Sequence, residues 1–220
     1  MNNLTQKSVA VIVAHPDDET LWAGGTILQH PSWEWFIVSL CRGNDPDRAP
    51  KFNQVLQILG ANGTMGDLDD GPEQLPLQEN EVEDAILNLM PPLHFDIIIT
   101  HNPSGEYTRH IRHEEISRAV ILLWSNGKLS ADELWTFGYA DDLKKHLPIP
   151  VLTATMQVEL SREIWIQKYR LITQTYGYSK ESWEANTCPE AEAFWRFTNS
   201  EDAVKWLNAG GIILKKIKHL

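Results

Sequence analysis

Short apolar runs alternate along the chain with longer stretches in which apolar side chains recur at helical spacing. Continuous apolar runs predict strands buried on both faces of a sheet at residues 8–14, 34–40 and 95–100. Helical spacing predicts helices at residues 19–29, 50–59, 79–89 and 114–124. Further strands are expected at 134–139 and 151–158, a helix at 162–175, and a less regular terminal stretch at 202–220. This alternation predicts a Rossmann-like three-layer α/β/α fold with a mostly parallel sheet.

The chain has 220 residues and shows no internal repeat, low-complexity segment or linker, so a single domain over residues 1–220 is expected. A chain of this length buries about 70% of its unfolded surface and needs no disulfide to fold. Its two cysteines, Cys41 and Cys188, form no CxxC pair. Together with an N-terminus that lacks an apolar leader, they predict a soluble cytoplasmic protein.

The balance of charge argues against several classes of partner. Lys and Arg number 19 against 30 Asp and Glu, which gives a formal net charge of -11. No basic run could follow a phosphate backbone, so neither nucleic acid nor a membrane is expected as a partner. The glycine fingerprint of dinucleotide-binding proteins is also missing, because Gly24 and Gly25 lie one turn into a predicted helix. Assembly into a homo-oligomer stays open.

Clusters of ionisable residues follow two of the predicted strands. The segment His15-Pro16-Asp17-Asp18-Glu19 follows the first strand, and the segment 109–115 carries His110 and His113. The carboxyl ends of parallel strands meet at one edge of a sheet, where ligands bind. Pro16 makes the turn between His15 and Asp18 rigid, so these two residues can face a common centre. Either His110 or His113 can add a third ligand. An acidic helix start or solvated histidines would account for each segment alone, but the two together indicate a metal site.

These motifs resemble the LmbE-like, or PIG-L, family of zinc-dependent N-deacetylases. Similar stretches are Leu40-Cys41-Arg42-Gly43, Leu68-Asp69-Asp70-Gly71 and Thr100-His101-Asn102. The likeness covers about residues 8–120 and fades through the C-terminal hundred residues.

The resemblance implies roles for individual side chains. His15, Asp18 and His113 would bind the metal, which is expected to be Zn²⁺, with Fe²⁺, Co²⁺ or Mn²⁺ as alternatives. Asp17 would act as the general base, and His110 would stabilise the oxyanion.

Three further residues are candidate substrate contacts by the same resemblance. Arg42 and Asp70 match positions at which the family holds its sugar, and Tyr107 lies close to the first histidine of the second motif. The glycine-rich stretch that family members often carry there is replaced by Ser104-Gly105-Glu106. His101 shares this loop, but a structural role is expected for it.

The expected function is removal of an acetyl group from an N-acetylated sugar of the N-acetylglucosamine type, or from a related small amide, by zinc-activated water. Two alternatives stay open. One is a non-catalytic, metal-containing protein of the same fold that binds a sugar or acts in regulation. The other is an amidase that acts on a non-sugar amide.

Overall fold

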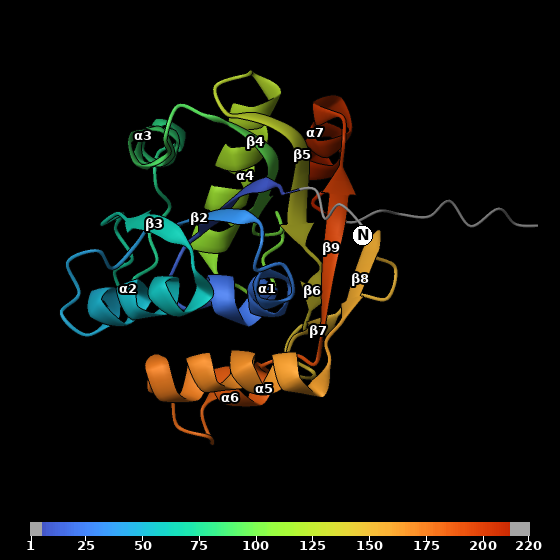
Figure 1. Ribbon diagram of the computed structural model, residues 1–220. Coiled ribbons are helices and arrows are strands. Elements are labelled where there is room, and N and C mark those ends of the chain that lie inside the picture. Colours follow the sequence, from blue (N-terminus) through green and yellow to red (C-terminus); the bar gives the residue numbers. More distant parts are fainter. Residues whose placement is uncertain (1–5, 212–220) are drawn as a thin grey trace, which may run out of the picture.

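The computed structural model describes residues 6–211, and its central feature is a seven-stranded sheet in the order β3-β2-β1-β4-β5-β9-β8 (Figure 1). The parallel strands are β1 (Ser8–Val13), β2 (Glu34–Ser39), β3 (Asn62–Met65), β4 (His94–Thr100) and β5 (Ser130–Phe137). At one edge, β9 (Ala191–Phe197) runs antiparallel to both β5 and β8 (Met156–Glu159). The predicted mostly parallel sheet is therefore confirmed.

Helices cover both faces of this sheet. On one face lie α1 (Asp18–Gln29) and α2 (Arg48–Leu59), and α5 (Arg162–Arg170) packs against α1. On the other face lie α3 (Glu79–Leu89), α4 (Ile111–Ser125) and α7 (Ser200–Asn208). The core has two halves, because alternate side chains of β1 point to opposite faces: Val11 packs with α1 and α2, and Ile12 with α3 and α4. The predicted three-layer architecture is confirmed.

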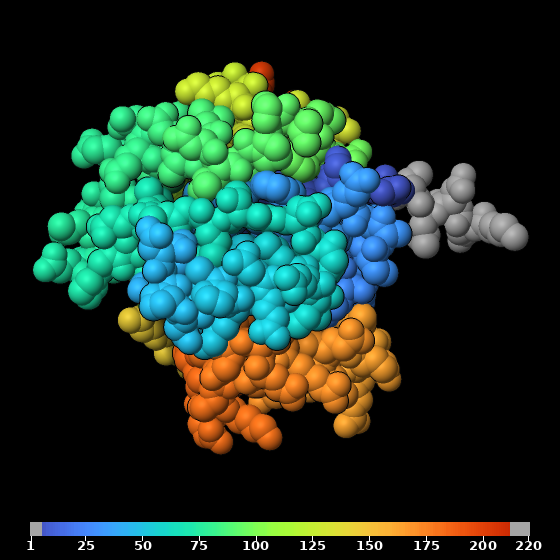
Figure 2. Space-filling view, turned by 60° about the vertical axis from the view of Figure 1, so that its left-hand side comes forward, coloured from blue at the N-terminus to red at the C-terminus, as the bar shows by residue number. Residues whose placement is uncertain are grey.

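The C-terminal part of the chain continues from α5 into a π-helical turn, η1 (Leu171–Thr175), and a short helix, α6 (Trp183–Thr187). Figure 2 shows this segment packed directly below α2. A small ribbon of β6 (Tyr139–Ala140) and β7 (Ile149–Pro150) completes the fold. None of the helices within residues 6–211 has both the length and the apolar character that a membrane span requires.

Most predicted elements agree with the structure to within a few residues, and the differences have local causes. Only the end of the strand expected at 151–158 forms, as β8 from Met156, because residues 151–155 make a turn between β7 and β8. β3, β9 and α6 were not predicted. The helix expected from residue 114 begins at Ile111, so His113 lies in its first turn rather than in a loop. The terminal stretch expected at 202–220 begins as α7, and residues 212–220 lie outside the described part of the chain.

The order of the strands places the two ionisable segments side by side. β1 pairs with β2 on one side and with β4 on the other, so the chain reverses its direction of winding between β1 and β4. Such a switch point opens a crevice at the carboxyl ends of the strands. The loop after β1 carries His15, and the loop after β4 leads to His110 and His113.

Candidate metal centre and active site

The first pair of candidate ligands lies between the end of β1 and the start of α1. His15 Nδ1 is 3.2 Å from Asp18 Oδ2, and the backbone N–H of His15 donates to the same oxygen at 2.9 Å. Trp22 Nε1 donates to the other oxygen of Asp18 at 3.0 Å. The carboxylate of Asp18 is therefore fixed from both sides, and it is nearly inaccessible to solvent.

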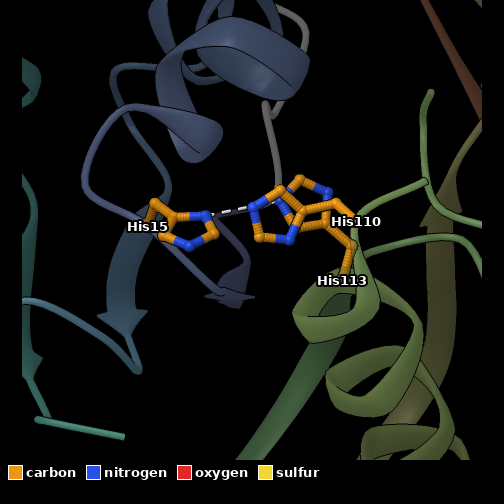
Figure 3. Close-up of side chains that lie close together, drawn as sticks. All are labelled: His15, His110 and His113. Carbon is orange, nitrogen blue, oxygen red and sulfur yellow. Dashed lines mark hydrogen bonds between the residues drawn. The ribbon is translucent and has the colours of Figure 1, made fainter. Parts of the chain in front are cut away.

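The third candidate ligand, His113, comes from the first turn of α4, and Figure 3 shows its ring beside that of His110 on the side that faces His15. Its Nε2 is 3.3 Å from Asp18 Oδ2 and 3.4 Å from His15 Nδ1. Ligand atoms that sit about 2.0–2.1 Å from one tetrahedral ion are separated by about 3.4 Å. The two imidazole nitrogens and the carboxylate oxygen therefore fit a shared first-row metal ion.

Each of the two histidines turns its other ring nitrogen toward a carboxylate. His15 Nε2 lies 3.2 Å from Asp70 Oδ2, and His113 Nδ1 lies 2.6 Å from Glu106 Oε2. Ligand histidines in metalloproteins are commonly oriented by such outer carboxylates. The contact between Glu106 and His113 matches this pattern, whereas Asp70 lies close to His15 Nε2 without hydrogen-bond geometry.

Two further histidines approach the same centre. A nitrogen of His110 lies within 4.8 Å of ligand atoms of His15 and His113, and His101 forms a similar group with Asp18 and His113. His110 Nδ1 is buried and has no hydrogen-bond partner among the residues that the structure describes. The structure therefore brings together all of the predicted histidines and adds His101 beside them.

Asp17 lies next to these groups but points its carboxylate elsewhere. Its φ of 126° is a strained conformation for a residue with a side chain, and such strain is concentrated at functional sites. Asp17 Oδ2 accepts a hydrogen bond from Tyr178 and lies 3.6 Å from Arg48 Nη1. Tyr176, two residues before Tyr178, donates to Glu19 Oε1 at 2.7 Å. Sequence reasoning assigned no role to these tyrosines.

The ionisation of the cluster follows from burial and from its close charges. Burial opposes the charged form of His113. The charge of Asp18 and its hydrogen bond with His113 outweigh burial, so the pKa of His113 is raised to about 10. His15 behaves similarly, with Asp18 and Asp70 raising its pKa to about 9 against burial. Protons on these two imidazoles thus balance the buried carboxylates, and a divalent cation would supply the same positive charge in their place.

The pKa values of Asp17 and His110 shift in the directions that favour their neutral forms. Burial, and then the charge of Asp18, raise the pKa of Asp17 to about 8, although the hydrogen bond from Tyr178 opposes this. Burial, and then the charges of His113 and His15, lower the pKa of His110 to about 3. The His110 imidazole is therefore neutral at physiological pH.

The cluster opens into a cavity of about 890 Å³. All of the predicted site residues line it except His113, which is fully buried beneath the others. Arg42 donates to Asp70 Oδ2 at 2.8 Å, so these two predicted substrate contacts are paired with each other at the rim. The ring of Tyr107 lies 4.8 Å from that of Trp183, and both rings line the cavity.

Arg112, between the two histidines of the second motif, holds the loop that carries Asp70. Its fully buried guanidinium donates to the carbonyl oxygens of Asp69 at 2.5 Å and Leu75 at 2.8 Å. It also pairs with Glu115 at 2.5 Å. This contact fixes the position of Asp70 relative to α4.

Sequence reasoning missed several residues of the site for one shared reason. Glu106, Arg48 and Tyr178 belong to no recognisable motif, and their contacts depend on how distant segments pack. The one available signal was a carboxylate at Glu106 inside the second histidine loop.

Comparison with known proteins places this site in a family. The sequence model of the PIG-L family, described as GlcNAc-PI de-N-acetylase, matches residues 10–124. An uncharacterized protein of Acanthamoeba polyphaga mimivirus is 23% identical over 145 residues, which cover 59% of this chain and 60% of the viral protein. The chain thus spans less than two thirds of that relative.

Solved structures with the same fold include two deacetylases and a hydratase. The N,N'-diacetylchitobiose deacetylase of Pyrococcus horikoshii has a TM-score of 0.68 and 14% identity, covering 97% of this chain and 88% of its own. The zinc-inhibited teicoplanin deacetylase has a TM-score of 0.60 and 14% identity, covering 82% and 88%. The 4-carboxy-2-hydroxymuconate hydratase of Pseudomonas putida has a TM-score of 0.60 and 17% identity, covering 87% and 96%.

The TM-scores show that these proteins share the fold, and at such low sequence identity they show the fold alone. The family match also shows membership of a family, because it spans more than half of the chain. It includes every candidate metal ligand from His15 to His113. The protein belongs to the PIG-L (GlcNAc-PI de-N-acetylase) family.

Proposed function

We propose that the protein is a metal-dependent deacetylase of the LmbE type that removes the acetyl group from an N-acetylated sugar or a related small amide. The observation that carries this proposal is the convergence of His15 Nδ1, Asp18 Oδ2 and His113 Nε2 to within 3.2–3.4 Å of one another beside the separate carboxylate of Asp17. Membership of the PIG-L family supports deacetylase chemistry.

His15, Asp18 and His113 would hold the metal ion. When bound, such an ion polarises a carbonyl oxygen and lowers the pKa of water to about 7. Zinc suits a set of two imidazoles and one carboxylate, and Fe²⁺, Co²⁺ or Mn²⁺ accept the same ligands.

Asp17 supplies the proton transfers. The positive charge of a bound ion would favour the ionised form of Asp17 over the neutral form that burial favours. The carboxylate then takes a proton from the attacking water and returns it to the nitrogen of the leaving amine. Tyr178 and Arg48 hold this carboxylate in the lining of the cavity.

His110 stabilises the charge that develops on the substrate oxygen. A neutral imidazole donates through one ring N–H, and His110 has a nitrogen that is not engaged by any described residue. A well-placed donor of this kind contributes about 3 kcal/mol to transition-state stabilisation.

The cavity lining supports a small polar substrate with an apolar face. Arg42 and Asp70 offer a donor and an acceptor for hydroxyl groups, and the adjacent rings of Tyr107 and Trp183 offer aromatic surface. Both cysteines are free and buried, which agrees with the proposed cytoplasmic location.

The experiment that tests the function is acetate release from a panel of N-acetylated sugars, sugar conjugates and plain amides by the metal-loaded protein. The Asp17→Asn variant is expected to lose several orders of magnitude in kcat and to keep its metal. Glu184→Gln, which changes an acid at the cavity mouth that is not assigned to the chemistry, should retain activity.

Two results would contradict the proposal. Undiminished turnover by Asp17→Asn would remove Asp17 as the base. Absence of acetate release from every member of the panel, with metal bound to the protein, would overturn the deacetylase and favour a binding protein of the same fold.

A further inference from the structure

A fully buried carboxylate lies behind the metal centre, on the side away from the substrate cavity. Glu106, in the loop between β4 and α4, has no solvent exposure and is not part of the lining shared by Asp17 and His110. Its Oε2 lies 2.6 Å from His113 Nδ1 and 2.9 Å from His101 Nδ1. Its Oε1 accepts the backbone N–H of Asn102 at 2.8 Å. Glu106 is thus shared by two histidines.

The proton position on His101 follows from a backbone contact. The N–H of Ala14 points to His101 Nε2 at 2.9 Å. A backbone N–H can only donate, so Nε2 must accept and the ring proton must be on Nδ1. His101 therefore donates to Glu106. Because its Nε2 lone pair is engaged, His101 is not a metal ligand, although it lies within 4.8 Å of Asp18 and His113.

The same reasoning extends to His113. Its Nδ1 donates to Glu106, so Nε2 is the ring nitrogen that faces Asp18 and His15, and its lone pair becomes available when a metal ion replaces the proton there. The ring of His101 stacks on that of His113 with centroids 3.9 Å apart and 24° between their planes, which blocks rotation of the ligand ring.

We propose that Glu106 and His101 form a positioning unit that fixes the tautomer and ring orientation of His113 for the metal ion. This inference rests on the metal centre of the proposed function. Its members join the end of β1, through Ala14, to the end of β4 and the first turn of α4. The unit therefore holds His113 in a fixed position relative to the end of β1, which leads to His15 and Asp18. Loss of an outer carboxylate of this kind lowers metal affinity about 10- to 100-fold.

The test is metal binding by the full-length Glu106→Gln variant. We expect its dissociation constants for Zn²⁺ and Co²⁺, measured by chelator competition, to rise about 10- to 100-fold. We also expect the visible absorption of bound Co²⁺ to change. The matched control is Glu114→Gln, which makes the same change one residue after His113 at a partly exposed carboxylate that pairs with Arg109. Affinity of Glu106→Gln within about twofold of the unaltered protein would overturn the proposal.

A second measurement decides the matter even if Glu106→Gln fails to fold. In the unaltered protein, nitrogen-15 NMR of the histidine rings should show His101 as the Nδ1–H tautomer, and His113 as the Nδ1–H tautomer when Zn²⁺ is bound. An Nε2–H proton on His101 would overturn the proposal.

The outcomes separate this inference from the proposed function. If the unaltered protein binds none of the ions, the metal centre is wrong and the positioning role falls with it. A different result is that the unaltered protein binds metal, that Glu106→Gln weakens this binding, and that no acetate is released. The positioning role would then be supported, and only the proposed deacetylase activity would be wrong.

Discussion

The side chains of the metal centre are held in place by contacts that differ from one residue to the next. Asp18 is fixed by a backbone N–H and by Trp22, whereas His113 is fixed by Glu106. The candidate ligands could be named from the sequence, because a histidine and an aspartate three residues apart, directly after a buried strand, are typical of a metal site. The carboxylates that contact these ligands could not be named from the sequence. The role of Glu106 depends on its burial beside the ring of His113, which no local pattern predicts.

Replacement of His113 by alanine should abolish stoichiometric metal binding. The change removes one of three ligands and leaves Asp18 with a single imidazole partner in the set. Metal content after gel filtration of the zinc-loaded protein measures the effect. His146→Ala, an exposed histidine at the cavity mouth, is the control and should keep its metal. Full occupancy in the His113 variant would refute the ligand assignment.

At the scale of elements, the antiparallel edge of the sheet is tied to the helix that carries Asp18. Glu192, on β9, accepts the backbone N–H groups of Gly25 and Thr26 in α1, each at 2.7 Å. It also pairs with Lys168 of α5 at 2.7 Å, and neither side chain of this pair is exposed. One carboxylate therefore joins β9, α5 and α1.

Replacement of Glu192 by glutamine should lower the free energy of unfolding by about 3–5 kcal/mol, because Lys168 would remain buried without a charged partner. Urea denaturation followed by far-UV circular dichroism measures this change. Glu190→Gln alters an exposed acid just before the same strand and should change stability by less than about 0.5 kcal/mol. Equal stability of the two variants would contradict this assignment.

The elements that sequence patterns missed are those with little pattern of their own. β3 has only four residues and includes Gly63, where a Cβ atom would lie 2.2 Å from the carbonyl oxygen of Ile37. The close approach of two strands thus requires a glycine, which is a residue that weakens any strand prediction. β1, β2 and β4 were predicted because continuous apolar runs of their length suit a strand buried on both faces.

At the scale of the whole molecule, the segment after residue 124 completes the sheet that the family motifs begin. β5, β9 and β8 extend the sheet beyond β4, and Tyr178, Trp183 and Glu184 line the cavity. We therefore infer a single domain in which the C-terminal part supplies both an edge of the sheet and residues of the site, including Tyr178 and Trp183.

A single domain predicts one cooperative unfolding transition for the metal-free protein. Far-UV circular dichroism and tryptophan fluorescence should give the same midpoint, because buried tryptophans report on both parts: Trp22 and Trp35 near the N-terminus, Trp195 and Trp206 near the C-terminus. Thermal and urea unfolding in the presence of a chelator test this expectation. Two transitions with separate midpoints would show that the C-terminal part unfolds independently.

The sequence by itself determined the α/β class, the long buried strands and helices of the first 125 residues, and the candidate ligands, because these depend on periodicity and on spacing over a few residues. Only the tertiary structure decided which distant groups complete the site. Tyr178 reaches Asp17 across 161 residues, and Glu192 reaches Gly25 across 167. Such contacts leave no local pattern, because they arise when the sheet closes and its layers pack. Packing therefore placed the candidate ligands and the candidate base of a recognisable motif together at one cavity.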